Sequence, residues 1–135
     1  MYDQVIVGVV NLPWRKGKTL FSTDERMGFL QHATEELGNI EVQPFSSLLV
    51  EYARERGAMA IVKGLRAISD FEYELEMNQL NRRQAPEIES VYLMASAKYS
   101  FLSSSGVKEL ATFGGDIEDL VPDEVAAALK ERLSR

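Results

Sequence analysis

Short apolar runs alternate with segments of helical period along this chain of 135 residues. Residues 5–10 are apolar at every position (Val-Ile-Val-Gly-Val-Val), a pattern typical of a parallel strand that is buried on both faces. Shorter β-branched or apolar runs predict further strands at residues 40–42, 60–62 and 91–94. Helical periodicity predicts helices at residues 47–56, 70–81, 103–113 and 123–133. Strands that alternate with helices form parallel βαβ units, so we predict a three-layer α/β sandwich in which residues 1–135 make one domain.

An additional helix is predicted between the first two strands, with a clear beginning and end. Glu25 follows Ser22 by three residues, which is the spacing of a capping box. Gly38 is suited to the left-handed conformation that ends many helices. The positions that line one face of this helix are Met27, Leu30, Thr34 and Leu37.

The composition excludes several classes of function. A net charge of −6 and a pI near 4.9 argue against a broad basic surface for nucleic acid, while a local basic pocket is compatible with them. The absence of cysteine excludes disulfides, thiol catalysis and thiolate metal sites. The single histidine, His32, is interpreted as a surface or boundary residue, so no metal ligands are predicted. The run at residues 5–10 is too short to span a membrane and follows no basic leader, so we expect a cytoplasmic protein.

Three segments with polar or basic residues follow predicted strands directly. They are the basic loop at residues 11–20, which carries Arg15, Lys16 and Lys18, and the segments at residues 63–66 and 99–105. In open parallel sheets, ligands bind beyond the carboxyl ends of the strands. The three segments are therefore expected to converge on one rim of the sheet and to form one ligand site.

Three consecutive serines, residues 103–105, stand at the predicted start of a helix. The backbone N–H groups of a helix start have no partners within the helix and lie at the positive end of the helix dipole, an arrangement that suits phosphate oxygens. Serine is also an ordinary N-cap residue. Phosphate binding and simple capping are therefore both open interpretations of these hydroxyls.

The charged residues near these segments also have two interpretations each. Lys63 and Arg66 flank Gly64, where the backbone can approach a ligand or adopt an unusual φ, and both cations can meet anionic oxygens or can be surface charges. Glu74 follows Asp70 in an acidic run that either complements the helix dipole or places Glu74 against a sugar hydroxyl or a base. Without a thiol, a Ser–His pair or a metal cluster, these residues favour phosphoryl or nucleotidyl transfer by positioning and charge stabilisation.

These residues, in this order, resemble the bacterial phosphopantetheine adenylyltransferases, which are nucleotidyltransferases with a Rossmann-like sandwich. The resemblance rests on Lys-Gly-Leu-Arg at residues 63–66, Asp-Phe-Glu-Tyr-Glu at 70–74, Asn78, Asn81, and Tyr-Ser-Phe-Leu-Ser-Ser-Ser at 99–105. Phe-Ser-Thr-Asp-Glu-Arg at 21–26 and Gly-Gly-Asp at 114–116 fit the same pattern, so the similarity extends over essentially the whole chain.

The resemblance implies a reaction and an assembly. The 4′-phosphate of phosphopantetheine attacks the α-phosphate of ATP, with Mg²⁺ assisting, and dephospho-coenzyme A and pyrophosphate form. Dephospho-coenzyme A and coenzyme A are the ligands expected besides the two substrates. The resemblance also implies a cytoplasmic homohexamer with no nucleic-acid or membrane partner.

The resemblance further assigns roles to single residues. Gly64, Leu65, Arg66 and Glu74 are expected to contact ATP. The triphosphate is expected to lie against Tyr99, Ser100, Phe101, Leu102, Ser103, Ser104 and Ser105, with the last two nearest the helix end. Lys63 stands where the family often has an arginine that contacts substrate, and as a point charge it makes a less directional contact. Leu49 is expected to line the pantetheine arm, and Lys16, or as second choice Lys18, is expected to contact the substrate and the reacting phosphates.

The sequence departs from the family pattern at its beginning. The family has a first strand, a Gly-x-Phe-Asp-Pro segment and a Gly-His motif whose histidine binds ATP phosphates, whereas Met1 to Gln4 match the approach to the family's second strand. His32 lies after the basic loop and cannot replace that histidine. Without the central first strand and the first helix, we expect little or no adenylyltransferase activity, unpaired strand edges and a tendency to associate. The alternative function is that of a non-catalytic nucleotide- or coenzyme A-binding relic, or of a subunit in an assembly.

Overall fold

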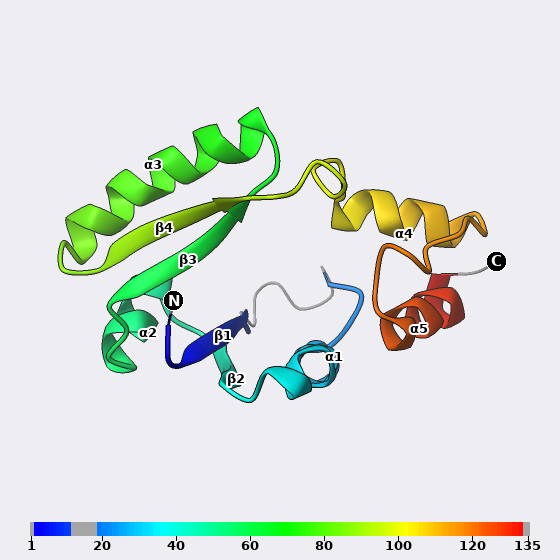
Figure 1. Ribbon diagram of the computed structural model, residues 1–135, viewed down its shortest axis with the longest axis horizontal. Helices are drawn as coiled ribbons and strands as arrows, with labels where there is room; N and C mark the ends of the chain where they lie inside the picture. The colour runs from blue at the N-terminus through cyan, green and yellow to red at the C-terminus, as the bar shows by residue number, and fades with distance from the viewer. Residues whose placement is uncertain (1, 12–18, 134–135) are drawn as a thin grey trace. The chain divides into compact units, whose positions relative to one another are not determined.

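The computed structural model describes residues 2–11 and 19–133, without the side chains of residues 68 and 69, and divides into two compact units (Figure 1). Unit 1 comprises Met1–Ser46 and Ala111–Arg135, and unit 2 comprises Ser47–Leu110. Each unit contains one pair of parallel strands. Every site residue that was predicted outside the basic loop belongs to unit 2.

Unit 1 is built on a strand–helix–strand unit. Its elements are β1 (Val5–Val10), α1 (Thr23–Thr34), the short 3₁₀ helix η2 (Glu35–Leu37), β2 (Ile40–Phe45) and α5 (Asp123–Leu133). β1 pairs with β2 in parallel, with Val5 opposite Ile40 and Val10 opposite Phe45. The bounds of β1 and α5 are those predicted, and so is the left-handed Gly38, with φ of 74°. β2 is three residues longer than predicted, because Gln-Pro-Phe at its end continues the pairing with β1.

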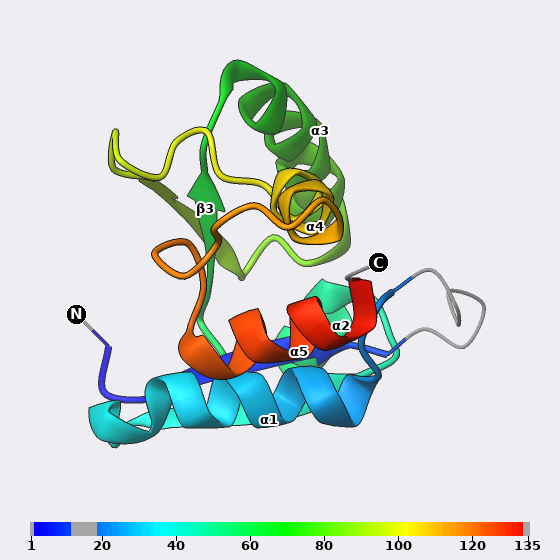
Figure 2. The same ribbon diagram turned by 90° about the vertical axis from the view of Figure 1, so that its right-hand side faces the viewer.

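The last helix, α5, runs alongside α1 in the opposite direction (Figure 2). At one end, the Arg132 guanidinium donates to both carboxylate oxygens of Glu25. At the other end, His32 Nδ1 lies 2.7 Å from Glu124 Oε2, and this contact raises the pKa of His32. Between these polar contacts α5 buries Ala126 and Leu129.

Glu25 has two structural roles at the start of α1. The predicted capping box is present, since the Ser22 hydroxyl accepts from the Glu25 N–H and Glu25 Oε1 accepts from the Ser22 N–H at 3.0 Å. The same carboxylate binds Arg132, which lies 107 residues away in the sequence. These hydrogen bonds, those from Arg132 first, lower the pKa of Glu25 to about 2 from an ordinary 4.5.

We predict that this carboxylate makes the fold acid-sensitive. Because the folded protein lowers its pKa, the contribution of Glu25 is complete above pH 4.5 and is lost as the pH falls toward 2. Thermal unfolding followed over this range should show a smaller decrease in Tm for Glu25→Gln than for the wild type. Glu36→Gln, a change at an exposed glutamate of η2, is the control and should retain the wild-type decrease. Equal decreases in the wild type and Glu25→Gln would contradict the assignment.

Unit 2 holds the remaining elements. They are α2 (Leu49–Glu55), β3 (Ala60–Leu65), α3 (Ile68–Gln84), β4 (Glu89–Met94) and α4 (Ser104–Thr112), of which the last two residues belong to unit 1. β3 pairs with β4 in parallel, with Ala60 opposite Glu89 and Leu65 opposite Met94, and α3 lies along both strands (Figure 1). The core of this unit consists of Val50, Ala53, Ile61, Ala85 and Ile88. α3 is longer than predicted at both ends, while α2 and α4 are slightly shorter.

The α/β class and the parallel strands confirm the predicted fold class. The four described strands form two separate pairs, β1 with β2 and β3 with β4, so each strand has one hydrogen-bonded neighbour among the described residues. Val62 and Leu93, at the middle and near the end of their strands, are 47% and 55% exposed. Parallel strands are ordinarily buried on both faces, so these two apolar side chains mark a face that is open in unit 2. The single domain stays a prediction.

Within the part of the chain that the structure describes, no helix is both long and apolar enough to cross a lipid bilayer.

Candidate functional site

The segment Lys-Gly-Leu-Arg lies at the carboxyl end of β3. Lys63, Gly64 and Leu65 are the last residues of the strand, and Arg66 is the first residue after it. The sequence analysis predicted that the strand ends at residue 62, before this segment. That end was wrong by three residues, because Lys63 and Gly64 interrupt the apolar run but continue the pairing with β4. The segment still occupies the edge of the sheet where α/β proteins bind ligands.

Gly64 is exposed and has an ordinary backbone conformation, since its φ is not positive. A Cβ atom added there would meet only the Leu93 carbonyl oxygen, at 4.0 Å, which is ordinary van der Waals contact. Of the two reasons given for a glycine here, an unusual φ is therefore ruled out. Close approach of a ligand to the backbone is the remaining one.

Arg66 connects the end of β3 to the segment before α4. Its Nε donates to Asp70 Oδ2 at 3.0 Å, its Nη2 donates to Asp70 Oδ1 at 3.4 Å, and its Nη1 donates to the Leu102 carbonyl. The backbone N–H of Arg66 also donates to Asp70 Oδ2, at 3.1 Å. Two of the three segments that were predicted to converge are thus joined by one side chain, which confirms this part of the prediction.

Asp70 has a role that the sequence did not reveal. Its acidic neighbours and its place near the start of α3 suggested a simple complement to the helix dipole. Asp70 does lie in the first turn of α3, and its carboxylate also orients the Arg66 guanidinium; these hydrogen bonds hold the pKa of Asp70 below its ordinary value. The i,i+4 spacing of Arg66 and Asp70 is the signal that could have indicated the pair.

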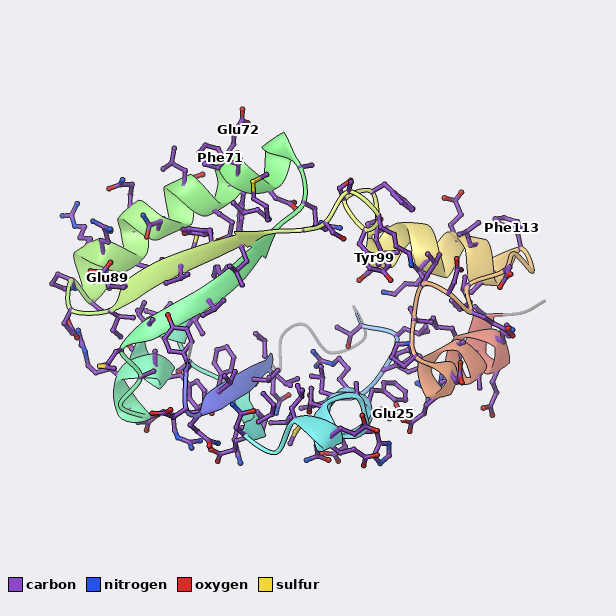
Figure 3. The ribbon with its side chains drawn as sticks, in the orientation of Figure 1. Glu25, Phe71, Glu72, Glu89, Tyr99 and Phe113 are labelled. Atoms are coloured by element: carbon purple, nitrogen blue, oxygen red, sulfur yellow. The ribbon has the colours of Figure 1, made fainter. Side chains whose placement is uncertain are left out.

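Lys63 and Glu74 form a half-buried ion pair between β3 and α3. Lys63 Nζ lies 2.9 Å from Glu74 Oε2, and the two side chains are 23% and 17% exposed. The Tyr92 hydroxyl on β4 donates to the Glu74 carbonyl oxygen at 3.3 Å. Glu74 therefore faces the two strands, whereas Phe71 and Glu72 point away from them (Figure 3).

Two polar atoms on this face of α3 have no hydrogen-bond partner among the described residues. Glu74 Oε2 and, one turn later, Asn78 Oδ1 are buried and accept no hydrogen bond from the described residues. The Lys63–Glu74 contact is thus mainly ionic. Buried polar atoms without partners are rare in native structures, and their clustering beside a buried charge is more typical of binding sites than of cores.

One of the three serines, Ser103, caps α4, while the other two lie in the first turn of the helix. The Ser103 hydroxyl accepts from the Gly106 N–H at 3.1 Å, and its carbonyl accepts from the Val107 N–H, so Ser103 is the N-cap of α4. Ser104 and Ser105 form the exposed first turn. For Ser103 the capping interpretation is confirmed, while Ser104 and Ser105 remain the candidates for phosphate.

A series of turns leads from β4 into α4. The Tyr99 N–H donates to the Ser96 carbonyl at 3.0 Å, and the Leu102 N–H donates to the Tyr99 carbonyl at 3.1 Å. Tyr99 lies on the stretch before α4 (Figure 3), with the Lys98 ammonium 5.3 Å from its ring centroid. Phe101 is 73% exposed, an unusual position for a large aromatic ring. Exposed aromatic and cationic groups thus lie just ahead of the helix start.

Other predicted residues are less closely connected with this site. Leu49, the first residue of α2, packs against the core of unit 2, and no described contact connects it with Arg66 or the serines. Lys16 and Lys18 lie outside the described residues, so their roles stay predictions.

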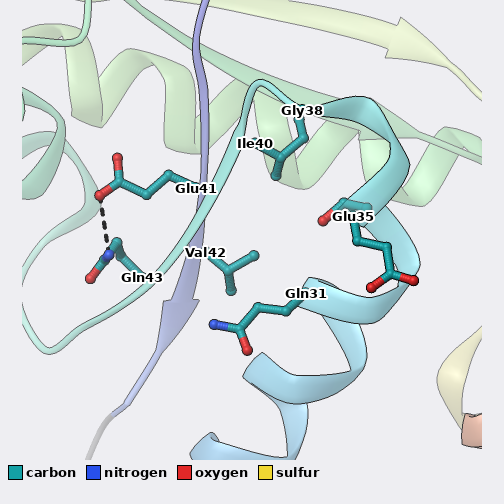
Figure 4. Close-up of a pocket in the computed structure, with 8 residues that line it drawn as sticks. Gln31, Glu35, Gly38, Ile40, Glu41, Val42 and Gln43 are labelled. Carbon is teal, nitrogen blue, oxygen red and sulfur yellow. Dashed lines mark hydrogen bonds between the residues drawn. The ribbon is translucent and has the colours of Figure 1, made fainter.

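An open hollow of about 410 Å³ lies elsewhere, in unit 1 between the end of α1 and β2 (Figure 4). It is lined by Gln31, Thr34, Glu35, Gly38, Ile40, Glu41, Val42 and Gln43. Gln43 Nε2 donates to Glu41 Oε1 there, at 3.1 Å. With two carboxylates and no cation among its described lining residues, this hollow does not suit a phosphate.

Comparisons with known proteins show the family of the chain. The model of the cytidylyltransferase-like family matches residues 1–110. The phosphopantetheine adenylyltransferase of Clostridium botulinum strain Hall is 48% identical over 132 residues, which cover 98% of this chain and 79% of that protein. The phosphopantetheine adenylyltransferase of Alkaliphilus metalliredigens is also 48% identical over 132 residues, which cover 98% of this chain and 83% of that protein. This chain therefore belongs to the phosphopantetheine adenylyltransferase family, within the cytidylyltransferase-like proteins.

Proposed function

We propose that the reaction of this chain is transfer of the adenylyl group of ATP to 4′-phosphopantetheine; the low activity expected from the sequence stays a prediction. A phosphate oxygen of the acceptor forms a bond to the α-phosphorus of ATP, the bond from that phosphorus to the β-phosphate oxygen breaks, and pyrophosphate leaves. The observation that carries the proposal is the Arg66 side chain, which joins the end of β3 to the segment before α4. The two segments that we propose to bind ATP are connected by this residue.

The roles of the residues follow from their chemistry. The described contacts of the Arg66 side chain use three of the five N–H donors of a guanidinium, which leaves donors for a phosphate. Ser104 and Ser105 add hydroxyls at the helix start, where anions are favoured. Gly64 and Leu65 supply backbone groups for ATP. Glu74 offers a hydrogen-bond acceptor to the nucleoside. Lys63 supplies a cation for 4′-phosphopantetheine. Such a site accelerates transfer by positioning and by charge stabilisation.

Magnesium enters this proposal as part of the MgATP substrate. Among the described residues, no three His, Cys, Asp or Glu side chains are arranged to hold a metal ion. Asp70 is paired with Arg66, and Glu74 with Lys63. Mg²⁺ commonly binds through substrate phosphates and water with few protein ligands, which fits this set of residues.

The test of the proposal is formation of the product. The chain is incubated with MgATP and 4′-phosphopantetheine, and dephospho-coenzyme A and pyrophosphate are quantified by mass spectrometry and a coupled assay. Equal amounts of both products, dependent on both substrates, would support adenylyl transfer. Tight binding of ATP or coenzyme A without product would favour the non-catalytic binding subunit instead.

Localisation and assembly belong to the same proposal. Because the family resemblance implies it, we propose that this protein is a cytoplasmic homohexamer. Light scattering coupled to gel filtration would measure the mass, and a monomer at working concentrations would contradict the assembly.

The Gly64→Ala variant should separate ligand contact from folding. The added methyl group fits against the Leu93 carbonyl, so we expect an unchanged Tm. If ATP lies against this backbone, the methyl group obstructs it and the Kd for MgATP should rise at least tenfold, or about 1.4 kcal/mol. Calorimetric titration measures the Kd, and Gly28→Ala is the control, since its Cβ has nothing within 4 Å. An unchanged Kd for Gly64→Ala would remove Gly64 from the ATP site.

The serines should respond differently to substitution by alanine. Ser103→Ala removes the cap of α4 and should lower the free energy of unfolding by about 1 kcal/mol. Ser104→Ala and Ser105→Ala leave the cap in place, so they should change stability little and should weaken binding of MgATP more than that of AMP. Urea denaturation and calorimetry measure the two effects. If Ser103→Ala loses stability and none of the three variants loses affinity for the triphosphate, helix capping is the only role of these serines.

A further inference from the structure

Three polar residues follow one another at intervals of four along α3. They are Asp70, Glu74 and Asn78, and residues four apart lie on the same side of a helix. Asp70 binds the Arg66 guanidinium by hydrogen bonds. Glu74 binds the Lys63 ammonium, with 2.9 Å between Oε2 and Nζ. Asn78 Oδ1, in contrast, is buried and accepts no hydrogen bond from the described residues, which is rare and calls for an explanation.

Asn78 lies farther from the proposed nucleotide site than the other two residues. Because β3 and β4 are parallel, α3 runs back from the carboxyl end of β3 toward the start of β4 (Figure 1). Along this direction Asp70 comes first, beside Arg66, and Asn78 comes about two turns later. Glu74 and Asn78 are about 6 Å apart along the helix axis. A ligand that reaches Asn78 from Lys63 therefore extends away from Arg66.

The acceptor substrate has the shape and the chemistry that this arrangement requires. In the proposed reaction its phosphate meets the α-phosphate of ATP, so the rest of the molecule points away from the nucleotide. A short carbon chain joins that phosphate to the nearer of two amide groups, and its extended length is comparable to the rise between Glu74 and Asn78. An amide N–H that leaves water needs an acceptor, and the oxygen of an asparagine side chain is one.

We propose that Asn78 binds the acceptor substrate, and that its Oδ1 accepts a hydrogen bond from the amide N–H nearer the phosphate of 4′-phosphopantetheine. The inference rests on the proposed function, which places that phosphate at Lys63. The χ2 angle of asparagine is only loosely restricted, so the half-buried side chain can turn its amide toward the ligand without a shift of α3. The oxygen lacks a partner in the free protein because its partner is the substrate.

Replacement of Asn78 by leucine separates a ligand contact from a structural role. Leucine has a similar size and offers no acceptor, so Asn78→Leu should bind 4′-phosphopantetheine about fivefold to 10²-fold more weakly, as expected when a buried N–H loses its only partner. The Tm should stay the same or rise, because a buried oxygen without a partner is removed. Calorimetric titration and thermal unfolding measure the two effects. Gln79→Leu, a change at the exposed amide next in the sequence, is the matched control and should leave the affinity unchanged.

An analogue of the substrate tests the same hydrogen bond from the side of the ligand. An ester in place of the amide nearer the phosphate removes the N–H and keeps nearly the same shape. The wild type should bind this ester about fivefold to 10²-fold more weakly than 4′-phosphopantetheine. Asn78→Leu should bind the two compounds almost equally, since its hydrogen bond is already lost. The comparison in the wild type also keeps the inference testable if Asn78→Leu folds poorly.

The outcomes distinguish this inference from the proposed function. Equal affinities of the wild type for the amide and the ester would overturn the inference alone. Wild-type affinity of Asn78→Leu for 4′-phosphopantetheine would do the same, and a lower Tm or a weaker binding of MgATP beside it would assign Asn78 to the structure or to the nucleotide. A wild-type chain that does not bind 4′-phosphopantetheine would overturn the proposed function, and this inference with it.

Discussion

Lys63→Met is expected to lower the free energy of unfolding by about 1–3 kcal/mol, because it leaves the Glu74 carboxylate half-buried without its ammonium partner. Breaking a fully buried ion pair costs more free energy than this. We expect the smaller value because both side chains of this pair are partly exposed. Urea denaturation measures the change. Arg82→Met, which breaks the exposed Arg82–Glu89 contact at 3.8 Å, is the control and should change stability by less than about 1 kcal/mol.

The double variant Lys63→Met/Glu74→Leu separates the stability of the pair from its function. Replacing both charges by apolar groups of similar size removes the unpaired carboxylate, so stability should return to within about 1 kcal/mol of the wild type. Binding of MgATP and of 4′-phosphopantetheine should stay at least tenfold weaker, since both proposed contacts are gone; this factor corresponds to about 1.4 kcal/mol. A double variant that is stable and binds both ligands normally would show that the pair is only a packing element.

Arg66→Ala should weaken binding of MgATP by about tenfold to 10²-fold, the usual range for loss of hydrogen bonds to a charged group. Arg66 is partly exposed, so we expect a small change in Tm beside this loss of affinity. Asp70→Asn should have a smaller effect in the same direction, because the guanidinium is retained but its orienting carboxylate is weakened. Calorimetric titration with MgATP measures both variants. Arg54→Ala is the matched control, because Arg54 also binds one carboxylate and one carbonyl, those of Glu87 and Gln84. Equal affinities of Arg54→Ala and Arg66→Ala would contradict the assignment of Arg66.

Local patterns in the sequence predicted the elements that depend on neighbouring residues. The capping box of Ser22 and Glu25 and the left-handed Gly38 depend on contacts within a few residues, so spacing was sufficient to predict them. The bounds of β1 and α5 were predicted because they coincide with an unbroken apolar run and with a segment of helical period. The ends of β2 and β3 were missed because polar residues, proline or glycine there resemble a loop, whereas backbone pairing with β1 and β4 continues through them.

Contacts between distant residues could not be predicted in this way. Nothing near Glu25 indicates Arg132, which reaches it only because α5 packs against α1. The Lys63–Glu74 pair likewise depends on how α3 lies on β3. In the candidate site, motif order identified Arg66 and the serines, while the distinct roles of Ser103, as a cap, and Asp70, as the partner of Arg66, depend on hydrogen-bond geometry.

We propose that the nucleotide binds where Arg66, after the end of β3, meets the segment before α4. Hydrogen–deuterium exchange of the chain, with and without MgATP, tests it most directly. We expect MgATP to slow exchange at the backbone N–H groups of residues 64–66 and 99–106, with little change at residues 31–43 around the hollow of unit 1. Protection at residues 31–43 alone, or binding of MgATP without protection of either predicted segment, would contradict the account.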